Sequence, residues 1–354
     1  MAVVYTVKRS DPKSAADDLL RLWRDNLSVL DDVRQKFDWT YYDGPERPSE
    51  VYLLASDADG AARIVGTAAV GIRRFQMGER VGRAALLADL AVDRAHRTLL
   101  PALMLVREIR SDALASFDLI YGFPNKYAQG VFRRVGYKEL GTMTRYVRVL
   151  RHTPYVARVL RLPLLPRLGG PLIDLATLGR RVPAMFKINR TCRLGWLPDV
   201  DERFDRLWEE ARSDYRRIGH RGSAFLRWRF LRHPSSRFAV AALIRRDREA
   251  SLAAYAIVQR DGGVAHIADL FGRTGDLGDL LDLMIGSLWR QGVASISFWF
   301  LGSGRVVRLL TERGFKKRES TRSVVFEAGA SLTAEGADLA DVEGWHLTEG
   351  DEDT

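Results

Sequence analysis

The chain has 354 residues, 46% of them apolar and 28% charged, which is typical of a soluble globular protein with room for two or three domains. Its only cysteine, Cys192, cannot form an internal disulfide, in keeping with a reducing compartment. The first ten residues contain too short an apolar run for a signal peptide, and no charge-free apolar run reaches about 18 residues, so we expect a cytoplasmic protein.

Charge is distributed unevenly along the sequence. The formal net charge is +10, but Glu327–Thr354 holds nine acidic residues and no Lys or Arg, so the chain before it carries +19. Such an excess suits a phosphate-rich cofactor, an acidic carrier protein or an anionic membrane surface. Nucleic acid is the least favoured partner, because no helix-turn-helix, zinc-ligand or aromatic-stacking signature accompanies the charge.

The N-terminal region predicts a strand, two helices and a pair of strands. These are a strand at Val3–Lys8, a helix after Ser14, a helix at Val29–Phe37, and strands at Val51–Ser56 and Arg63–Phe75. Between them lies the aromatic cluster Phe37–Tyr42, followed by a turn. The cluster either packs in the core under a loop or lines an apolar acceptor pocket.

The next stretch predicts two parallel strands, each followed by a helix. Its elements are the strand Leu86–Val92, the loop Asp93–Thr98, a helix over about Leu100–Ser116, the strand Asp118–Phe123 and a helix led by Asn125. A final strand over Thr142–Leu150 completes the region.

The helix led by Asn125 carries a recognisable pattern. An Asn is followed by Ala three residues on, an aromatic residue at seven, and Gly-aromatic at eleven and twelve: Asn125, Ala128, Phe132, Gly136 and Tyr137. This pattern, together with the order of elements, resembles the GNAT superfamily of N-acyltransferases. The resemblance implies an α/β fold with a twisted mixed sheet flanked by helices. It also implies an acyl-CoA bound at the end of a central strand, with its phosphates at a helix start.

The resemblance also indicates which residues would bind the acyl-CoA. The family's phosphate turn has the pattern Gln/Arg-x-x-Gly-x-Gly/Ala; here Arg97 and Ala102 match it, Leu100 replaces the first glycine, and Pro101 has no N–H to donate. Phe132 stands where many members have a tyrosine that protonates the leaving thiolate. The expected binding residues are Leu90, Ala91, Val92, Arg94, Arg97, Leu100, Ala102, Asn125 and Phe132.

A basic, apolar segment follows the first region. Val149–Arg193 holds nine Lys or Arg and one acid, Asp174, interleaved with aliphatic residues and interrupted by prolines. Such a segment either lies in a membrane interface, with its arginines at the phosphates, or connects two domains.

From Val200 the arrangement of elements is repeated. Ala268-Asp269-Leu270 corresponds to Ala88-Asp89-Leu90, and Gly314-Phe315 corresponds to Gly136-Tyr137. We therefore predict two tandem GNAT-like domains over 1–150 and 196–326, a connector over 151–195 and an acidic tail over 327–354. The tail either covers a basic face of the fold or is disordered. In the second copy, Asp276 and Asp279 make the phosphate turn a poor CoA site.

Four side chains are candidates for removing a proton from an amine. Asp89 and Asp269 each lie on a strand between apolar residues, where burial would raise the pKa of the carboxyl group towards neutrality. The alternative for each is a structural aspartate that caps a turn or pairs with an arginine. His220, in a glycine-flanked loop, and His266, on a strand, are the other two candidates, and a structural hydrogen bond is the alternative for both.

These features predict an N-acyltransferase that transfers an acyl group from an acyl-CoA or acyl-carrier thioester to a primary amine, without a metal. The lost glycine, the basic connector and the aromatic cluster favour a long-chain acyl group and a lipid-like amine, such as the sphingoid base of bacterial ceramide synthesis. A peripheral position on the inner face of the cytoplasmic membrane would suit that chemistry. The alternatives are an acetyltransferase for an amino sugar or small amine, and a non-catalytic protein that binds acyl-CoA or another ligand.

Overall fold

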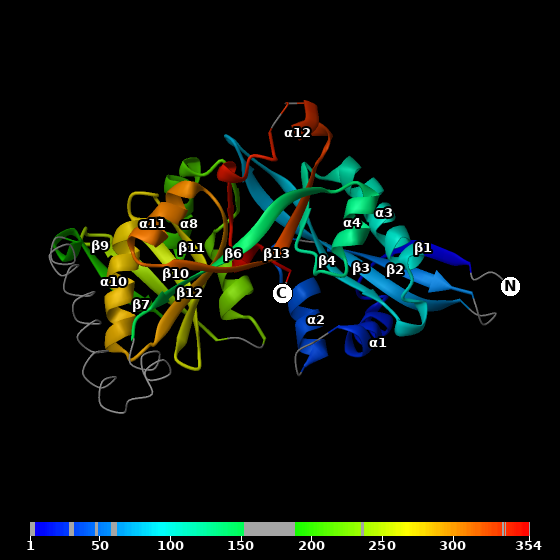
Figure 1. Cartoon of the computed structure of the whole chain (residues 1–354), viewed down its shortest axis with the longest axis horizontal. Helices are drawn as coiled ribbons and strands as arrows, with labels where there is room; N and C mark the ends of the chain where they lie inside the picture. The colour runs from blue at the N-terminus through cyan, green and yellow to red at the C-terminus, as the bar shows by residue number, and fades with distance from the viewer. Residues whose placement is uncertain are drawn as a thin grey trace.

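Figure 1 shows the computed structural model, which describes residues 4–27, 32–46, 49–57, 62–151, 188–234, 237–334, 336 and 338–353. Two lobes lie side by side, each a sheet covered by helices, and the C-terminal end of the chain lies between them. Most of the predicted connector, residues 152–187, falls outside the described residues. Across the described ranges, no helix is long and apolar enough to cross a membrane.

The N-terminal elements follow the predicted order. They are β1 (Tyr5–Ser10), α1 (Ala16–Asn26), α2 (Val33–Tyr41), β2 (Glu50–Ser56), β3 (Arg63–Met77), β4 (Arg80–Val92), α3 (Leu99–Ser116), β5 (Leu119–Gly122), α4 (Gln129–Val135) and β6 (Lys138–Val149). Helix α2 begins later than predicted because Asp32 caps it, accepting a hydrogen bond from the Gln35 N–H. Because the helix continues to Tyr41, most of the aromatic cluster is helical.

The first lobe is a sheet in the order β1-β2-β3-β4-β5 with helices on both faces. All its neighbours are antiparallel except β4 and β5, which are parallel as predicted. Alternation along β2 directs Tyr52 and Leu54 into the core under α3 and α4, and Val51 and Leu53 into the core under α1 and α2.

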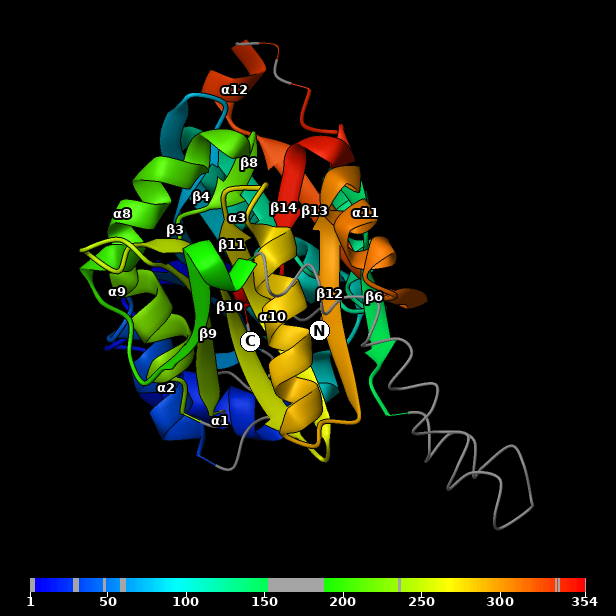
Figure 2. The same cartoon turned by 90° about the vertical axis from the view of Figure 1, so that its left-hand side faces the viewer.

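The second lobe repeats this plan. Its elements are β7 (Cys192–Leu197), α8 (Glu202–Ala211), β8 (Arg217–Gly219), α9 (Ser223–Leu226), β9 (Phe238–Arg245), β10 (Leu252–Asp261), β11 (Val264–Gly272), α10 (Leu277–Arg290), β12 (Ser295–Gly302), α11 (Gly304–Glu312) and β13 (Lys316–Ala328). Ala254 and Ala256 of β10 face α10, whereas Tyr255 and Ile257 face α8. Figure 2 shows α10 lying across this sheet.

The last strand of each lobe pairs with the other lobe. Strand β13 lies between β5 of the first lobe and β6, and β6 lies between β13 and β12 of the second lobe. Each lobe thus contains a strand supplied by the other half of the chain, and the two lobes form one continuous sheet. Figure 1 shows β6 and β13 crossing between them.

The C-terminal tail closes this sheet into a ring. The tail forms α12 (Ala330–Ala334) and the short strand β14 (Trp345–Leu347), which pairs with β12 and with β8, while β8 pairs with β3. The ring runs β3-β4-β5-β13-β6-β12-β14-β8 and returns to β3. It encloses an apolar core that includes Phe75, Tyr121, Met143 and Trp345.

The tail covers a basic region between the lobes, which was one of the two alternatives for it. Arg221, fully buried, forms ion pairs with Asp269 at 3.0 Å and with Asp351 at 2.7 Å. Arg322 pairs with Glu349 and Glu352. The residues Glu349–Asp351 form a 3₁₀ turn capped by Thr348.

Candidate active site

Strands β4 and β5 separate partway along β4. They are paired in parallel up to Leu87 and Gly122, whereas β4 continues to Val92. A β-bulge in β4 contains Asp89, whose backbone has a left-handed φ of 53°. Beyond Leu87, the β5-facing edge of β4 has no strand partner among the described residues. Bulges commonly end strand pairing and redirect a side chain, and here the bulge turns the Asp89 carboxyl group towards α2.

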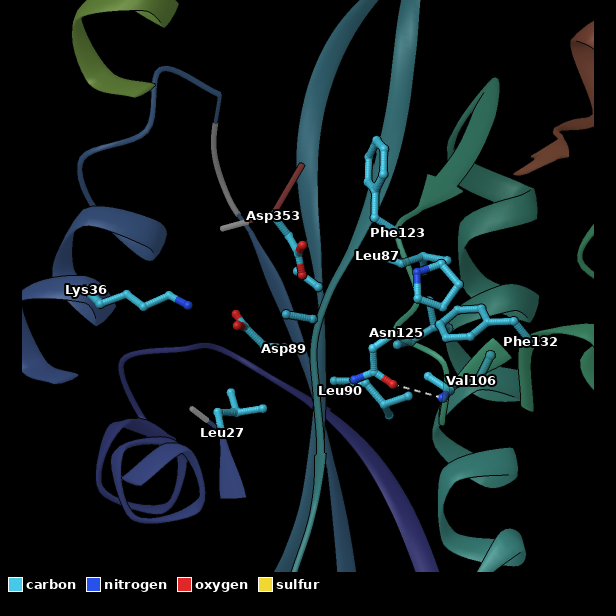
Figure 3. Close-up of a pocket in the computed structure, with 16 residues that line it drawn as sticks. Leu27, Lys36, Leu87, Asp89, Leu90, Val106, Phe123, Asn125, Phe132 and Asp353 are labelled. Atoms are coloured by element: carbon cyan, nitrogen blue, oxygen red, sulfur yellow. Dashed lines mark hydrogen bonds between the residues drawn. The ribbon is translucent and has the colours of Figure 1, made fainter. Parts of the chain in front are cut away.

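The divergence opens a cavity, which we call cavity A, with a volume of about 230 Å³. One side is lined by α3, α4 and the end of β5, including Val106, Phe123, Asn125 and Phe132. In Figure 3 these residues lie on one side of β4, and Lys36, Asp89 and Asp353 lie on the other. Cavity A therefore extends from an apolar side to an acidic side, with the bulge between them.

Asp89 is buried at the acidic end of cavity A. Its Oδ2 accepts a hydrogen bond of 3.0 Å from the Tyr41 hydroxyl. Burial raises the pKa of Asp89 to about 6, whereas the Lys36 ammonium and the Tyr41 bond act in the opposite direction. A carboxyl group with that pKa is largely ionised at neutral pH and can still accept a proton from an ammonium group.

The tail adds two more carboxyl groups. The Asp353 carboxylate accepts a hydrogen bond from the Asp89 backbone, and burial raises its pKa. Burial also raises the pKa of Glu352 to about 7, although its bond to Arg322 lowers it. Nothing in the sequence indicated that Glu352 and Asp353 would approach Asp89, since acid-rich tails are usually solvated.

Two smaller cavities continue from the acidic end. Cavity B shares Ala69, Ala88, Asp89 and Asp353 with cavity A and runs along β3 and β4 to Arg73. Cavity C, with a volume of about 200 Å³, shares Pro45, Glu46 and Arg73 with cavity B. Its wall also includes His220, Arg221 and Asp351. The three cavities thus lie in series, with Asp89 at the first junction and Arg73 at the second.

The aromatic cluster packs in the core, which was one of the two alternatives for it, and it also lines a cavity. Phe37 packs with Trp23 and Tyr41 in the core under α1 and α2. Trp39, Thr40 and Tyr41 also line cavity B. The wall of cavity B is more polar than an apolar pocket, because it includes the charged side chains of Arg73, Arg229 and Glu352.

Three of the expected donor-binding residues line cavity A: Leu90, Asn125 and Phe132. The Asn125 side chain accepts hydrogen bonds from the Tyr127 and Ala128 N–H groups, so it shapes the turn that leads into α4. Ala91 and Val92 lie on β4 beyond the bulge and pair with β3. Because no described strand pairs with the β5-facing edge of β4 beyond Leu87, the backbone groups on that edge face the divergence.

The expected phosphate turn is less suited to its ligand. Arg97 binds the Val92 carbonyl and Asn26, so its guanidinium already holds the turn in place. Arg94 lies in a 3₁₀ turn, and Ala102 packs against the core of the first lobe. Leu100 is 52% exposed and Pro101 lies in the first turn of α3. The residues present therefore fit the acyl-pantetheine arm of an acyl-CoA, but they fit its pyrophosphate poorly, with fewer N–H donors than an uninterrupted helix start.

Asp269, the counterpart of Asp89, lies in a closed structural network. Its oxygens accept hydrogen bonds from Arg221, from Tyr255 at 2.8 Å and from Thr348 at 2.8 Å, and its side chain is fully buried. The sequence had allowed pairing with an arginine as the alternative, and that is the role the structure shows.

The tail also fills the corresponding divergence in the second lobe. Strand β14 pairs with β12 at Leu301 and Gly302, and the His346 Nε2–H donates to the Leu270 carbonyl of β11 at 2.9 Å. The space that holds cavity A in the first lobe is occupied here by the protein's own chain.

The two candidate histidines lie apart from Asp89. His266 accepts or donates a 2.7 Å hydrogen bond at Nδ1 to the Ser297 hydroxyl on the neighbouring strand, and lines none of the three cavities. His220 lines cavity C, where burial lowers its pKa to about 4. Its Nδ1 accepts a hydrogen bond from the Gly222 N–H, and its ring packs edge-on against Trp208. Within the described ranges, no group of three side chains could hold a metal ion.

Comparison with solved structures shows that the chain has the fold of the GCN5-related N-acetyltransferases, because several of the similar structures carry that name. A conserved protein of unknown function from Enterococcus faecalis V583, titled "Probable N-Acyltransferase", aligns with a TM-score of 0.65 and 14% identity over 96% of this chain and 73% of that one. GCN5-related N-acetyltransferases from Anabaena variabilis and Kribbella flavida align with TM-scores of 0.63 and 0.61, identities of 11% and 15%, and coverage of 93% and 95% of this chain and 74% of each of theirs. No protein-family model and no curated protein sequence matches.

Proposed function

We propose that the protein is an N-acyltransferase that transfers an acyl group from an acyl-pantetheine thioester to a primary amine at the first lobe. The observation that carries the proposal is the junction of cavities A and B at Asp89. The thioester would enter from the α3 and α4 side, and the amine would enter from the side of α2 and the tail.

Asp89 would act as the general base. It would take one proton from the ammonium group, and the amine nitrogen would then form a bond to the thioester carbonyl carbon. The carbon–sulfur bond would break as the nitrogen releases its second proton to solvent. The free N–H groups on the edge of β4 would stabilise the negative charge on the carbonyl oxygen. Phe132 cannot donate a proton, so the leaving thiolate would be protonated from solvent, to which Asp89 would return its proton.

The acceptor is proposed to be a polar amine, the second of the two acceptor classes considered from the sequence. Asp89, Glu352 and Asp353 would attract an ammonium group, whereas the charged wall of cavity B suits a lipid tail poorly. Of the three features that favoured a sphingoid base, the basic connector lies mainly outside the described part of the chain, and the aromatic cluster packs in the core and lines the charged cavity B. The donor is either acyl-CoA or an acyl carrier protein, since both present the same pantetheine arm.

Release of free thiol tests the proposal. Wild-type protein would be incubated with acetyl-CoA, longer acyl-CoA thioesters and an acyl carrier protein, each with a panel of polar and lipid-like primary amines, and the products would be weighed by mass spectrometry. We expect amine-dependent thiol release that is lost in Asp89→Asn and retained in Asp38→Asn, which alters an exposed aspartate on α2. Absence of amine-dependent release with every donor would overturn the proposal in favour of a non-catalytic binding protein.

A further inference from the structure

Two neighbouring arginines, Arg73 on β3 and Arg229 after α9, have no carboxylate partner in an ion pair among the described residues. Three other arginines at the junction of the lobes do: Arg221 pairs with two aspartates, Arg74 with Glu46, and Arg322 with two glutamates. Burial lowers the pKa of both Arg73 and Arg229, and the Arg73 guanidinium further lowers that of Arg229, to about 10. Both guanidinium groups line cavity B, and the nearby carboxylates of the tail offset the cost of burying them only in part, so the site favours an anion.

The surrounding contacts hold the two guanidinium groups in place. Trp39 and Trp228 stack at 5.0 Å, and each indole N–H donates to the other's backbone carbonyl at 2.8 Å. Arg73 lies over the Trp228 ring at 4.7 Å, and Arg229 lies over Trp39 at 5.6 Å. A ligand would therefore meet charges that are already positioned.

These contacts leave hydrogen-bonding capacity unused. Arg229 donates to the backbone carbonyls of Glu349, Gly350 and Glu352, which are neutral partners. The buried Nε of Arg73 and the hydroxyl of Thr40 have no hydrogen-bond partner in the described structure. Both residues line cavity B, and a bound anion would accept hydrogen bonds from groups of this kind.

The position of Arg73 relates this site to Asp89. Ala69, Gly71 and Arg73 alternate onto one face of β3 and line cavity B, which ends at Asp89 near Ala69. Arg73 lies four positions along the strand from Ala69, which is about 13 Å between backbone positions. Cavity C continues from Arg73 away from Asp89.

We propose that Arg73, with Arg229 behind it, forms a subsite for an anionic group on the acceptor, so that the preferred acceptor is an amine that carries a carboxylate or phosphate several bonds from its nitrogen. The inference rests on the proposed function, since it assigns the amine to the Asp89 end. Arg73 is a specificity-determining residue here. The subsite binds a part of the acceptor that does not react, so its loss raises KM and leaves kcat nearly unchanged.

Matched amines test the subsite. The ω-amino acids γ-aminobutyrate and ε-aminocaproate are compared with their neutral amides, and phosphoethanolamine with ethanolamine, both as acceptors and by calorimetric titration. We expect kcat/KM and affinity to favour the anionic member of at least one pair by about tenfold, the effect of one charge-assisted hydrogen bond. The pair that shows the preference tells whether the subsite binds a carboxylate or a phosphate.

The variants are Arg73→Gln, Arg73→Lys and the control Arg9→Gln, which alters an arginine that is 56% exposed at the sheet edge. The preference disappears in Arg73→Gln, is partly retained in Arg73→Lys, and is unchanged in Arg9→Gln. If Arg73→Gln does not fold, the comparison of matched amines with wild-type protein and with Arg73→Lys still tests whether Arg73 binds the anionic group.

The possible results separate the two proposals. Equal use and equal binding of the charged and neutral members by wild-type protein would overturn the subsite while leaving the acyltransferase intact. Anion-dependent binding that requires Arg73, without acylation of any amine, would support the subsite and overturn the acyltransferase. A preference that persists in Arg73→Gln would assign the anion to other residues.

Discussion

The Tyr41 hydroxyl donates a 3.0 Å hydrogen bond to the carboxyl group of Asp89, a residue whose backbone lies in the left-handed region. The bond links the aromatic cluster at the C-terminal end of α2 to the bulge in β4. It stabilises the ionised form of Asp89 against the effect of burial. Tyr41 itself stays protonated, because burial and the nearby Asp89 charge raise its pKa well above the usual value.

The first prediction concerns the pH dependence of acyl transfer. With Asp89 as general base, kcat/KM should rise with pH through about 6, where the carboxyl group loses its proton, and then level off. Tyr41→Phe removes a bond that lowers this pKa, so the rising limb should move to higher pH. Asp89→Asn should reduce kcat/KM by about 100-fold or more at neutral pH. A rising limb that stays in place in Tyr41→Phe would show that another group titrates.

The second prediction is that Asp89→Asn makes the protein more stable at neutral and alkaline pH. The pKa of Asp89 is about 6 in the folded protein and 3.8 in the reference state, so the folded form binds this proton more tightly. The stabilisation from Asp89 is complete below pH 3.8 and is lost as the pH rises through about 6. Asn keeps an acceptor for Tyr41, tolerates a left-handed backbone and carries no charge to bury.

Thermal denaturation of wild type and Asp89→Asn should therefore diverge with pH. We expect a gain of about 1–3 kcal/mol in the free energy of unfolding at pH 8, and little difference at pH 4. A variant less stable than wild type at pH 8 would mean that the Asp89 charge is compensated in the folded protein.

The third prediction concerns Gly302, where β12 meets the tail. A Cβ atom at Gly302 would lie 1.9 Å from the Trp345 carbonyl oxygen, so Gly302→Ala should displace β14. Gly292→Ala is the matched control, because Gly292 also has a positive φ but nothing within 4 Å of the added atom. Limited proteolysis should cleave the tail faster in Gly302→Ala alone. Equal cleavage in both variants would attribute the effect to backbone strain.

The fourth prediction concerns the buried pair of Arg221 and Asp351. Asp351→Ala leaves the Arg221 guanidinium with Asp269 as its remaining carboxylate partner in the fully buried network, and should cost about 3–5 kcal/mol of unfolding free energy. Asp38→Ala removes an exposed partner of Arg34 and should cost less than about 1 kcal/mol. Chemical denaturation measures both losses, and similar values would show that the buried network contributes no more than a surface pair.

The sequence predicted the features that depend on local pattern. The alternation in Leu86–Val92, the turn residues around Asn125 and the spacing to Tyr137 are determined within short stretches, and the strand–helix–strand–helix unit follows from them. Asp89 was a candidate because of its apolar neighbours, and the same argument selected Asp269, which proved to be paired with Arg221. Burial alone could not separate the two, since the difference is the arginine, 48 residues away in the sequence.

The remaining features depend on contacts between distant parts of the chain. Each half ends in a strand that looks suited to its own sheet, and nothing in β6 or β13 indicates that it pairs with the opposite lobe. The position of Asp353 beside Asp89, and that of Arg229 beside Arg73, follow from the docking of the tail and the lobes. Trp345, a large apolar residue in an otherwise acid-rich tail, is buried in the ring core and fixes the tail there.

The reciprocal placement of β6 and β13 has a consequence for synthesis on the ribosome. The first lobe cannot complete its sheet when residue 150 emerges, because the strand beside β5 is Lys316–Ala328. Until then, β5 and β6 present unpaired edges that invite association with other chains. The nascent protein must therefore remain in a partly assembled state until β13 has been synthesised, and final folding of both lobes should occur together after that point.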